Sequence, residues 1–241
     1  MVPMFSEFAQ RSHEFERIDT GDYTAEEYDQ FLADIRIVNR FAGDNRALRK
    51  TLFRDVERSQ LKAFSVLDVG AGSGELLRTC ADFARKTGRG ASLCGLELSE
   101  RSSFAILEQS SGIDEIKAVR ADALALPFKS DSFDYVICSL FTHHFRENEI
   151  ETILAAMARV ARRKIFVIDL HRHPTASILY KMFCAVFVKG ILVKTDGALS
   201  IMRGFKPAEM QKIALNAGLS SASVKRYFPF RLVLEAGPNR S

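Results

Sequence analysis

Three glycines and one carboxylate lie together where an apolar run meets a helical pattern. The segment reads Val66-Leu67-Asp68-Val69-Gly70-Ala71-Gly72-Ser73-Gly74. Glycines between a strand and a helix let the backbone turn tightly and approach a ligand closely. The dinucleotide fingerprint G-x-G-x-x-G would need a third glycine at position 75, where this chain has Glu75. A carboxylate at a helix start repels pyrophosphate, so the loop favours a nucleotide-like ligand without phosphate.

Three carboxylates occur in order at three predicted strand ends. Asp68 lies in an apolar strand end and needs donors, which the ammonium group of an amino acid would supply. Glu97 follows 29 residues later (97 − 68 = 29) and can accept both hydroxyls of a ribose. Asp122, with Ala123 after it, can accept from an adenine amino group. Singly, each carboxylate could be a cap, a solvated strand end or a turn, but the ordered set describes S-adenosylmethionine.

Four segments carry a resemblance to a known family. V-L-D-V-G-A-G-S-G, L-E-L-S, R-A-D-A-L-A-L-P-F and S-F-D-Y-V-I-C-S-L resemble successive motifs of class I S-adenosylmethionine-dependent methyltransferases, most of all the ubiquinone/menaquinone-type group. The resemblance covers residues 64–170 and implies S-adenosylmethionine as the cofactor. It places the cofactor contacts at Asp68, Gly70, Gly72, Glu97, Asp122 and Ala123, with Ser139 lining the site. We add their neighbours Ala71, Gly74 and Leu98 to the cofactor-binding set.

Four of the five histidines follow two neighbouring predicted strands, where an acceptor would lie. His143 and His144 come after the fourth strand, and His171 and His173 after the fifth. Histidine titrates near neutral pH and can deprotonate a phenol or hydroxyl. We take His143 and His144 as candidate general bases, with pocket-shaping as the alternative, and assign His171 and Arg203 to acceptor binding. A surface or helix-end position would also explain Arg203. No carboxylate–histidine spacing supports a metal, so none is expected.

The expected reaction is transfer of a methyl group to oxygen of a small hydrophobic acceptor, a phenolic, polyketide or quinone-like molecule. The runs D-L-H-R-H-P and D-G-A-L-S-I-M-R-G-F are similar to those of bacterial methyltransferases that we associate with polyketide or phenolic-lipid pathways. Transfer to carbon, nitrogen or a protein stays open. A non-catalytic cofactor-binding protein that acts through partners is a second alternative. A nicotinamide-dependent dehydrogenase is a third, against which Glu75 argues.

An alternation of strands and helices must position these residues. Strands are predicted at 64–69, 91–98, 116–121, 133–140 and 165–170, and helices between them at 75–87, 100–110 and 149–162. This alternation predicts a Rossmann-like, doubly wound α/β sheet with right-handed crossovers. A final helix at 207–217 and strands at 222–228 and 231–234 add an antiparallel hairpin. The expected sheet therefore has seven strands and is mostly parallel.

Helices are predicted before the first strand and after the fifth. Residues 1–60 form a helical leader or lid, and residues 61–241 the main domain, with a helical insertion at 175–205. Thr24 and Glu27 fit a capping box, Gly43 ends that helix, and Asp44 can cap the next one. The insertion is apolar with interspersed lysines, typical of a packed helix, a lid over a hydrophobic acceptor, or a membrane-surface contact.

Bulk properties narrow the class of protein. The chain has 241 residues, of which 47% are hydrophobic and 27% charged, as expected for one globular α/β domain. A net charge of +4 is too small to argue for nucleic acid. Lys181 and Lys189 interrupt the longest apolar stretch, so we expect no transmembrane segment and allow only a weak contact with a membrane surface. Four separated cysteines and the lack of a signal-like N-terminus place the protein in the cytoplasm. The sequence does not determine the oligomeric state.

Overall fold

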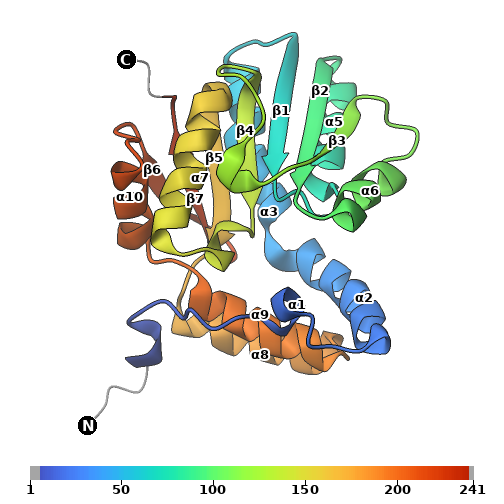
Figure 1. The fold of residues 1–241 in the computed structure, drawn as a ribbon, viewed down its shortest axis with the longest axis vertical. Helices are drawn as coiled ribbons and strands as arrows, with labels where there is room; N and C mark the ends of the chain where they lie inside the picture. The colour runs from blue at the N-terminus through green and yellow to red at the C-terminus, as the bar shows by residue number, and fades with distance from the viewer. Residues whose placement is uncertain (1–5, 239–241) are drawn as a thin grey trace.

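A seven-stranded sheet forms the centre of the computed structural model, which describes residues 6–238 (Figure 1). The strands are β1 (Ala63–Val69), β2 (Gly90–Glu97), β3 (Ile116–Arg120), β4 (Phe133–Ser139), β5 (Ala161–Leu170), β6 (Ser223–Tyr227) and β7 (Arg231–Ala236). Their order is β3-β2-β1-β4-β5-β7-β6, and only the pairs made by β7 are antiparallel. The predicted doubly wound, Rossmann-like sheet with a terminal hairpin is confirmed.

Helices cover both faces of the sheet. One face packs against α7 (Glu147–Val160) and α10 (Pro207–Asn216), and the other against α5 (Glu75–Thr87) and α6 (Glu100–Gln109). Successive strand residues point to opposite faces, so Val136 joins the first core and Ile137 the second. Both faces are apolar, as a covered parallel sheet requires.

The boundary between α7 and β5 differs from the prediction. The helix ends at Val160 rather than at residue 162, and the strand already begins at Ala161. Lys164 pairs with Tyr135 of β4, and its ammonium group contacts Asp55 at 2.6 Å and Glu235 at 2.7 Å. Because these partners are remote in sequence, a local pattern of basic residues could not reveal that the segment is a strand.

The leader contains α1 (Arg17–Thr20), α2 (Ala25–Ala42), α3 (Asp44–Leu48), a π-helical turn (Arg49–Phe53) and α4 (Arg54–Arg58). The capping box is confirmed, since the backbone N–H of Glu27 donates to Thr24 and that of Thr24 donates to Glu27. Gly43 ends α2 in the left-handed region, at φ +92°. The Asp44 side chain does not cap α3; its carboxylate accepts from Arg231 at 2.7 Å.

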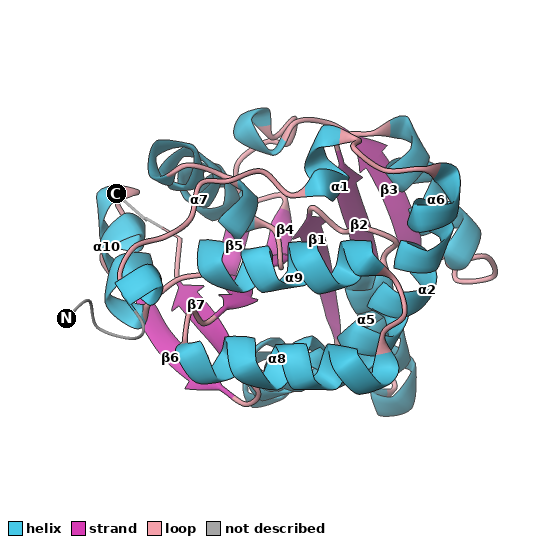
Figure 2. Ribbon diagram, turned by 90° about the horizontal axis from the view of Figure 1, so that it is seen from below, coloured by secondary structure: helices cyan, strands magenta, loops and turns pink. Residues whose placement is uncertain are grey.

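The insertion forms two helices, α8 (Pro174–Phe187) and α9 (Ile191–Arg203), beyond the carboxyl ends of the parallel strands. Figure 2 shows α9 crossing in front of the ends of β1, β4 and β5, with α1 beside it. The leader follows α9, since the backbone N–H of Ser12 donates to the carbonyl of Met202 and that of Ile18 to the carboxylate of Asp196. Among the described residues, no helix is both long and apolar enough to span a bilayer.

Candidate active site

The glycine loop joins β1 to α5, and its glycines serve different purposes. Gly70 has φ +71°, and a Cβ there would overlap the Phe141 ring. Gly72 has φ +56°, but a Cβ on it would meet no atom within 4 Å. The close approach at Gly70 is therefore made by a side chain of the protein, whereas Gly72 borders open space where a ligand can lie. Gly74 is the N-cap residue of α5 and has φ +80°.

Asp68 is a buried carboxylate with an unused oxygen. Its side chain is 2% exposed, and Oδ1 has no hydrogen-bond partner among the described residues. Burial, together with the negative charge of Glu97, raises the pKa of Asp68 well above its usual range. A buried acceptor without a donor is costly, so the position suits a ligand that brings its own N–H groups. An ammonium group fits this requirement.

The other predicted cofactor residues lie at the ends of neighbouring strands. Glu97 ends β2, and its Oε1 accepts from the backbone N–H of Gly72 at 2.5 Å. Burial raises the pKa of Glu97, although hydrogen bonds from backbone N–H groups oppose this shift. Leu98 directly follows and is largely exposed, while Ala71 in the loop is half-buried.

The structure places the remaining members of this set at the ends of β3 and β4. Asp122 caps the short helix Ala123–Ala125, accepting from the N–H of Leu124 at 2.9 Å, and Ala123 is buried. Ser139 ends β4, with its hydroxyl 3.4 Å from Oδ1 of Asp44. Asp68, Glu97, Asp122 and Ser139 thus line one edge of four adjacent parallel strands. Ligands bind outside this edge in open α/β sheets.

His143 forms a buried pair with Asp169. Its Nδ1 lies 2.7 Å from Oδ1 of Asp169, and the hydroxyl of Thr142 donates to Oδ2 at 2.6 Å. Burial would raise the pKa of Asp169, but the charge and hydrogen bond of His143 and the Thr142 hydroxyl hold it well below its usual range. An ionised Asp169 can only accept, so Nδ1 of His143 is the donor in this contact, and Nε2 is the ring nitrogen that faces away from Asp169.

Nε2 of His143 faces the leader. Oε1 of Glu16 lies 3.8 Å away, and both side chains are buried. The hydroxyl of Ser200 on α9 donates to the same Glu16 oxygen at 2.8 Å. Burial raises the pKa of Glu16, and this effect is larger than the lowering caused by the charges of His144 and His143. The leader therefore brings an acid–base group to within 4 Å of the candidate base.

His144 and Arg203 complete this cluster, in which Asp19 is their common partner. Nδ1 of His144 lies 3.0 Å from Oδ2 of Asp19, and Arg203 Nη1 contacts the same oxygen at 3.1 Å. Burial lowers the pKa of His144, but the Asp19 hydrogen bond and the Glu16 charge outweigh it and raise the pKa. Arg203 is buried at the last residue of α9, so a surface position is wrong and a helix-end position is right.

Three groups in the cluster could together hold a metal ion. Glu16, His143 and His144 each offer one ligand atom, and these atoms lie within 4.8 Å of one another. The sequence did not reveal this grouping, because Glu16 is remote from the histidines along the chain. Arg203 Nη1 lies 3.6 Å from Glu16, so a guanidinium already supplies positive charge there. The arrangement suits proton transfer better than metal binding.

The second histidine pair forms a separate group. His171 and His173 lie with ring centroids 5.4 Å apart, and His173 stacks on Phe230. His173 caps α8, accepting from the N–H of Thr175. Burial lowers the pKa of His171 to about 4, helped by the charge of Arg226. His171 therefore stays neutral at physiological pH, and its assignment to acceptor binding remains a prediction.

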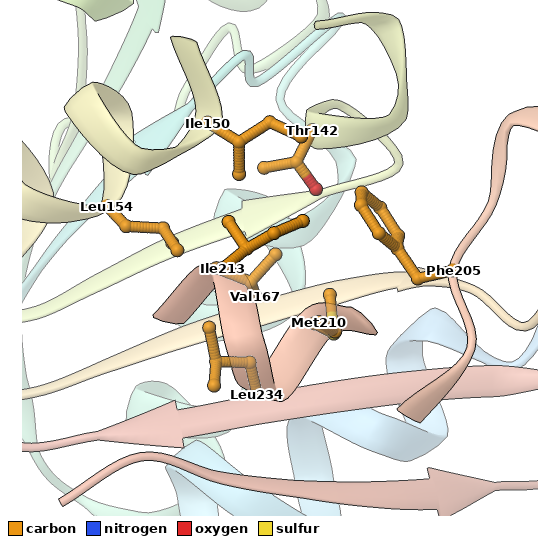
Figure 3. A pocket seen from close by; sticks show the side chains of 8 residues that line it. All are labelled: Thr142, Ile150, Leu154, Val167, Phe205, Met210, Ile213 and Leu234. Atoms are coloured by element: carbon orange, nitrogen blue, oxygen red, sulfur yellow. The ribbon is translucent and has the colours of Figure 1, made fainter. Parts of the chain in front are cut away.

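A small apolar cavity lies beside the Thr142 side chain (Figure 3). Its volume is about 10 Å³, which is the space of one water molecule. Eight side chains line it: Thr142, Ile150, Leu154, Val167, Phe205, Met210, Ile213 and Leu234. The Thr142 hydroxyl already donates to Asp169, so the cavity offers no polar recognition and is a packing defect of the core.

Sequence reasoning missed three carboxylates of the site. Asp169 had a usable signal, because it stands in an apolar strand end as Asp68 does. Glu16 and Asp19 had none, since the leader shows no motif there. The cysteines give no further candidates: all four are free and buried.

Comparisons with known proteins agree with this geometry. Residues 66–164 match the family described as methyltransferase domain. An uncharacterized methyltransferase, YcgJ, from Bacillus subtilis is 30% identical over 117 residues, covering 47% of this chain and 43% of the relative. Demethylmenaquinone methyltransferase from Staphylococcus aureus is 24% identical over 148 residues, covering 61% and 58%. The chain thus spans about half the length of these curated relatives.

One solved structure resembles nearly the whole chain. Magnesium protoporphyrin IX methyltransferase from Synechocystis PCC 6803, crystallised with bound SAH, has a TM-score of 0.61 and 17% sequence identity. The alignment covers 92% of this chain and 99% of that one. At this identity the likeness concerns the fold, including the helices outside residues 66–164.

Proposed function

We propose that this chain, which carries a class I S-adenosylmethionine-dependent methyltransferase domain, methylates an oxygen atom of a small hydrophobic acceptor. The family predicted from the sequence motifs is confirmed by the match over residues 66–164 and by distant homology to the menaquinone enzyme. The acceptor class that we propose is a phenolic, polyketide or quinone-like molecule. Both this class and the choice of oxygen rest on the chemistry of the site.

Four residues would hold the cofactor. When bound, S-adenosylmethionine supplies an electrophilic methyl group on a sulfonium centre. The unused oxygen of Asp68 suits the ammonium group, and the open side of Gly72 leaves room for the ligand. The carboxylate of Glu97 suits the ribose hydroxyls, and the carboxylate of Asp122, at the next strand end, would suit the adenine amino group.

The buried His143–Asp169 pair is the observation that carries the choice of oxygen. Methyl transfer to a hydroxyl needs a base for the departing proton. Nε2 of His143 accepts that proton, and the ionised Asp169 at 2.7 Å stabilises the resulting imidazolium. The bound cofactor would supply the methyl group and keep its sulfur as a neutral thioether, while the proton of the acceptor hydroxyl would pass to Nε2 of His143.

The leader and α9 would cover the site and exclude water from it. Glu16 covers Nε2 of His143, and the segment around it follows α9 through Ser12 and Ile18. The apolar residues Leu192, Val193 and Ile201 of α9 are buried. We expect the segment around Glu16 to move aside for the acceptor and to exclude water on its return.

Product formation with a panel of acceptors tests the proposal. Purified protein, S-adenosylmethionine and phenols, hydroxyquinones or hydroxylated polyketides should yield S-adenosylhomocysteine and an O-methyl product, identified by mass spectrometry and NMR. A C- or N-methyl product would overturn the choice of oxygen. Cofactor binding without product across the panel would favour the non-catalytic alternative.

A further inference from the structure

The outer face of α8 is apolar and exposed. Side chains that are between 48% and 74% exposed follow one another along it and just beyond its end: Ile178, Leu179, Met182, Val186, Phe187 and Ile191. The spacing of Ile178, Met182 and Val186 is four residues, so they form a row on one side of the helix. The apolar side of an amphipathic helix normally packs against the protein core, which makes this uncovered apolar row unusual.

The opposite side of α8 accounts for its attachment to the protein. Ala176, Ser177 and Cys184 are buried, and Cys184 packs in a cluster with Val193. Packing against α9 and α2 therefore uses one side of α8, and the outer row is not needed for it. Figure 1 places α8 at the bottom edge of the molecule, away from the sheet.

The apolar surface continues onto α2. The ring of Phe183 lies 5.8 Å from that of Phe41 and 4.9 Å from that of Phe187. Phe41 is itself 61% exposed. We call the exposed residues Phe41, Ile178, Leu179, Met182, Val186, Phe187 and Ile191 the α8 face. A contiguous patch of this kind marks an interaction site.

The segment that carries six of the seven residues of the α8 face, residues 170–195, has side-chain charges of one sign. Residues 170–195 contain no aspartate or glutamate, but they include the exposed Lys181 and Lys189. Asp34 of α2 approaches this segment, yet it is 2% exposed and accepts from the backbone N–H groups of Lys189 and Gly190. Its carboxylate therefore accepts from the backbone of this segment and from the Gln30 side chain, and no contact with a lysine ammonium group occurs among the described residues.

We propose that the α8 face docks on an anionic lipid surface, with its apolar row inserted at the headgroup boundary and Lys181 and Lys189 against lipid phosphates. An apolar helix face flanked by lysines is the arrangement that binds such surfaces, since burial of apolar area and attraction to anionic headgroups add. This inference goes beyond methyl transfer, because it concerns where the protein binds and not what it modifies.

A second copy of the chain fits the α8 face less well. In a twofold contact the same patch meets itself, so the lysines of both copies would come to one interface. Residues 170–195 of either copy offer no carboxylate to pair with them. Lipid phosphates supply the missing negative charge, which is why a lipid surface is the better partner.

The absence of tryptophan from the chain permits a site-specific test. A Met182→Trp variant would report on the α8 face alone, and Leu215→Trp is the matched control. Leu215 is also about half exposed but belongs to α10, which packs against α7 and β6. With vesicles of phosphatidylcholine and phosphatidylglycerol, we expect a blue shift for Met182→Trp and quenching by brominated lipid, and neither for Leu215→Trp.

Co-sedimentation with the same vesicles adds a test of the unlabelled protein. The full chain should bind mixed anionic vesicles, and binding should weaken about tenfold or more in the Lys181→Glu/Lys189→Glu variant. Met182→Asp/Val186→Asp should lower binding similarly, while Leu215→Asp should bind as wild type. The assay contains neither cofactor nor acceptor, so its failure would leave the proposed methyl transfer untouched.

Two outcomes would overturn the proposal. One is unchanged fluorescence of Met182→Trp together with no sedimentation on anionic vesicles. The other is a dimer detected by light scattering that Met182→Asp/Val186→Asp dissociates, with no lipid binding by the wild type. Equal binding to vesicles of phosphatidylcholine alone would overturn the role of the lysines.

Discussion

Nδ1 of His143 lies 2.7 Å from Oδ1 of Asp169, and both side chains are buried at the ends of adjacent strands. The backbone N–H of His143 donates to the other carboxylate oxygen at 3.2 Å, and the carbonyl of His143 accepts from Arg203 at 3.1 Å. The ring is therefore held at both its side chain and its backbone. Because Nδ1 is engaged by Asp169, Nε2 is the ring nitrogen that we expect to take a proton from an acceptor.

Replacing His143 should remove the base without removing the cofactor. We expect His143→Ala to lower kcat by about 10²–10⁴-fold, the usual contribution of a positioned base, with cofactor affinity near wild type. Calorimetry with S-adenosylhomocysteine and steady-state kinetics give the two readouts.

His173, in the separate second histidine pair, provides the control for that experiment. His173→Ala removes the cap of α8 and should cost about 1 kcal/mol of stability while keeping kcat.

Asp169→Asn should also lower kcat, because an amide can hold the wrong tautomer of His143. Full activity in both His143→Ala and Asp169→Asn would refute the assigned base.

Asp68→Asn should lose cofactor binding without loss of stability. The pKa of Asp68 is raised in the folded state, so its neutral form is favoured and ionisation costs stability as the pH rises through that pKa. The amide removes this cost and also the charge that an ammonium group needs. We expect about 10- to 100-fold weaker binding of S-adenosylhomocysteine, with an unchanged or higher Tm of the apoprotein.

Asp134→Asn is the matched control on the same sheet. Asp134 accepts from the N–H and hydroxyl of Ser65, both at 2.8 Å, near the start of β4. The Asp134→Asn variant should have a lower Tm than the wild type and the same cofactor affinity. Tight binding by Asp68→Asn would show that this carboxylate does not anchor the ligand.

Alanine at Gly70 and Gly72 should have unequal effects on folding. Both glycines have positive φ, which costs an alanine about 1–2 kcal/mol. Only at Gly70 would the new Cβ also overlap Phe141. Chemical denaturation should therefore show that Gly70→Ala loses several kcal/mol more than Gly72→Ala. Equal losses would mean that the Phe141 ring moves away freely.

The His144–Asp19 contact should make stability depend on pH. The pKa of His144 is raised in the folded protein, so its stabilising effect is complete below the unfolded pKa and disappears as the pH rises through the folded value. The loss caused by His144→Ala should be larger at about pH 6 than at about pH 9. In an Asp19→Asn background, that difference should shrink; an undiminished difference would assign it to another group.

Chelation should leave turnover unchanged. Glu16, His143 and His144 have ligand atoms close enough for a metal, but Arg203 already contacts Glu16 and Asp19. Dialysis against EDTA, followed by assay with and without added Zn²⁺ or Mg²⁺, checks this. Activity that falls on dialysis and returns with one metal would reassign the cluster to metal-assisted catalysis.

Local sequence patterns determined most of the fold and which carboxylates lie at the sheet edge where we propose that the cofactor binds. Apolar runs of strand length alternate with helical spacing, and this places Asp68, Glu97 and Asp122 at successive strand ends before any contact is known. The Thr24–Glu27 capping box was equally readable, because its two partners are three residues apart. These features depend on spacing within one element or on the rule that parallel strands share a direction.

Only the tertiary structure decided which side chains surround the candidate base His143 and which helix face stays exposed. Glu16 and Asp19 reach the histidines because the leader follows α9, a path that no local pattern encodes. The same holds for Gly70, whose positive φ a sequence can suggest but whose contact with Phe141 it cannot. The apolar run of α8 was compatible with a packed helix, a lid or a membrane-surface contact, and its exposed face became visible only in the structure. The physical reason is that burial and charge pairing depend on partners far along the chain, whereas periodicity and capping do not.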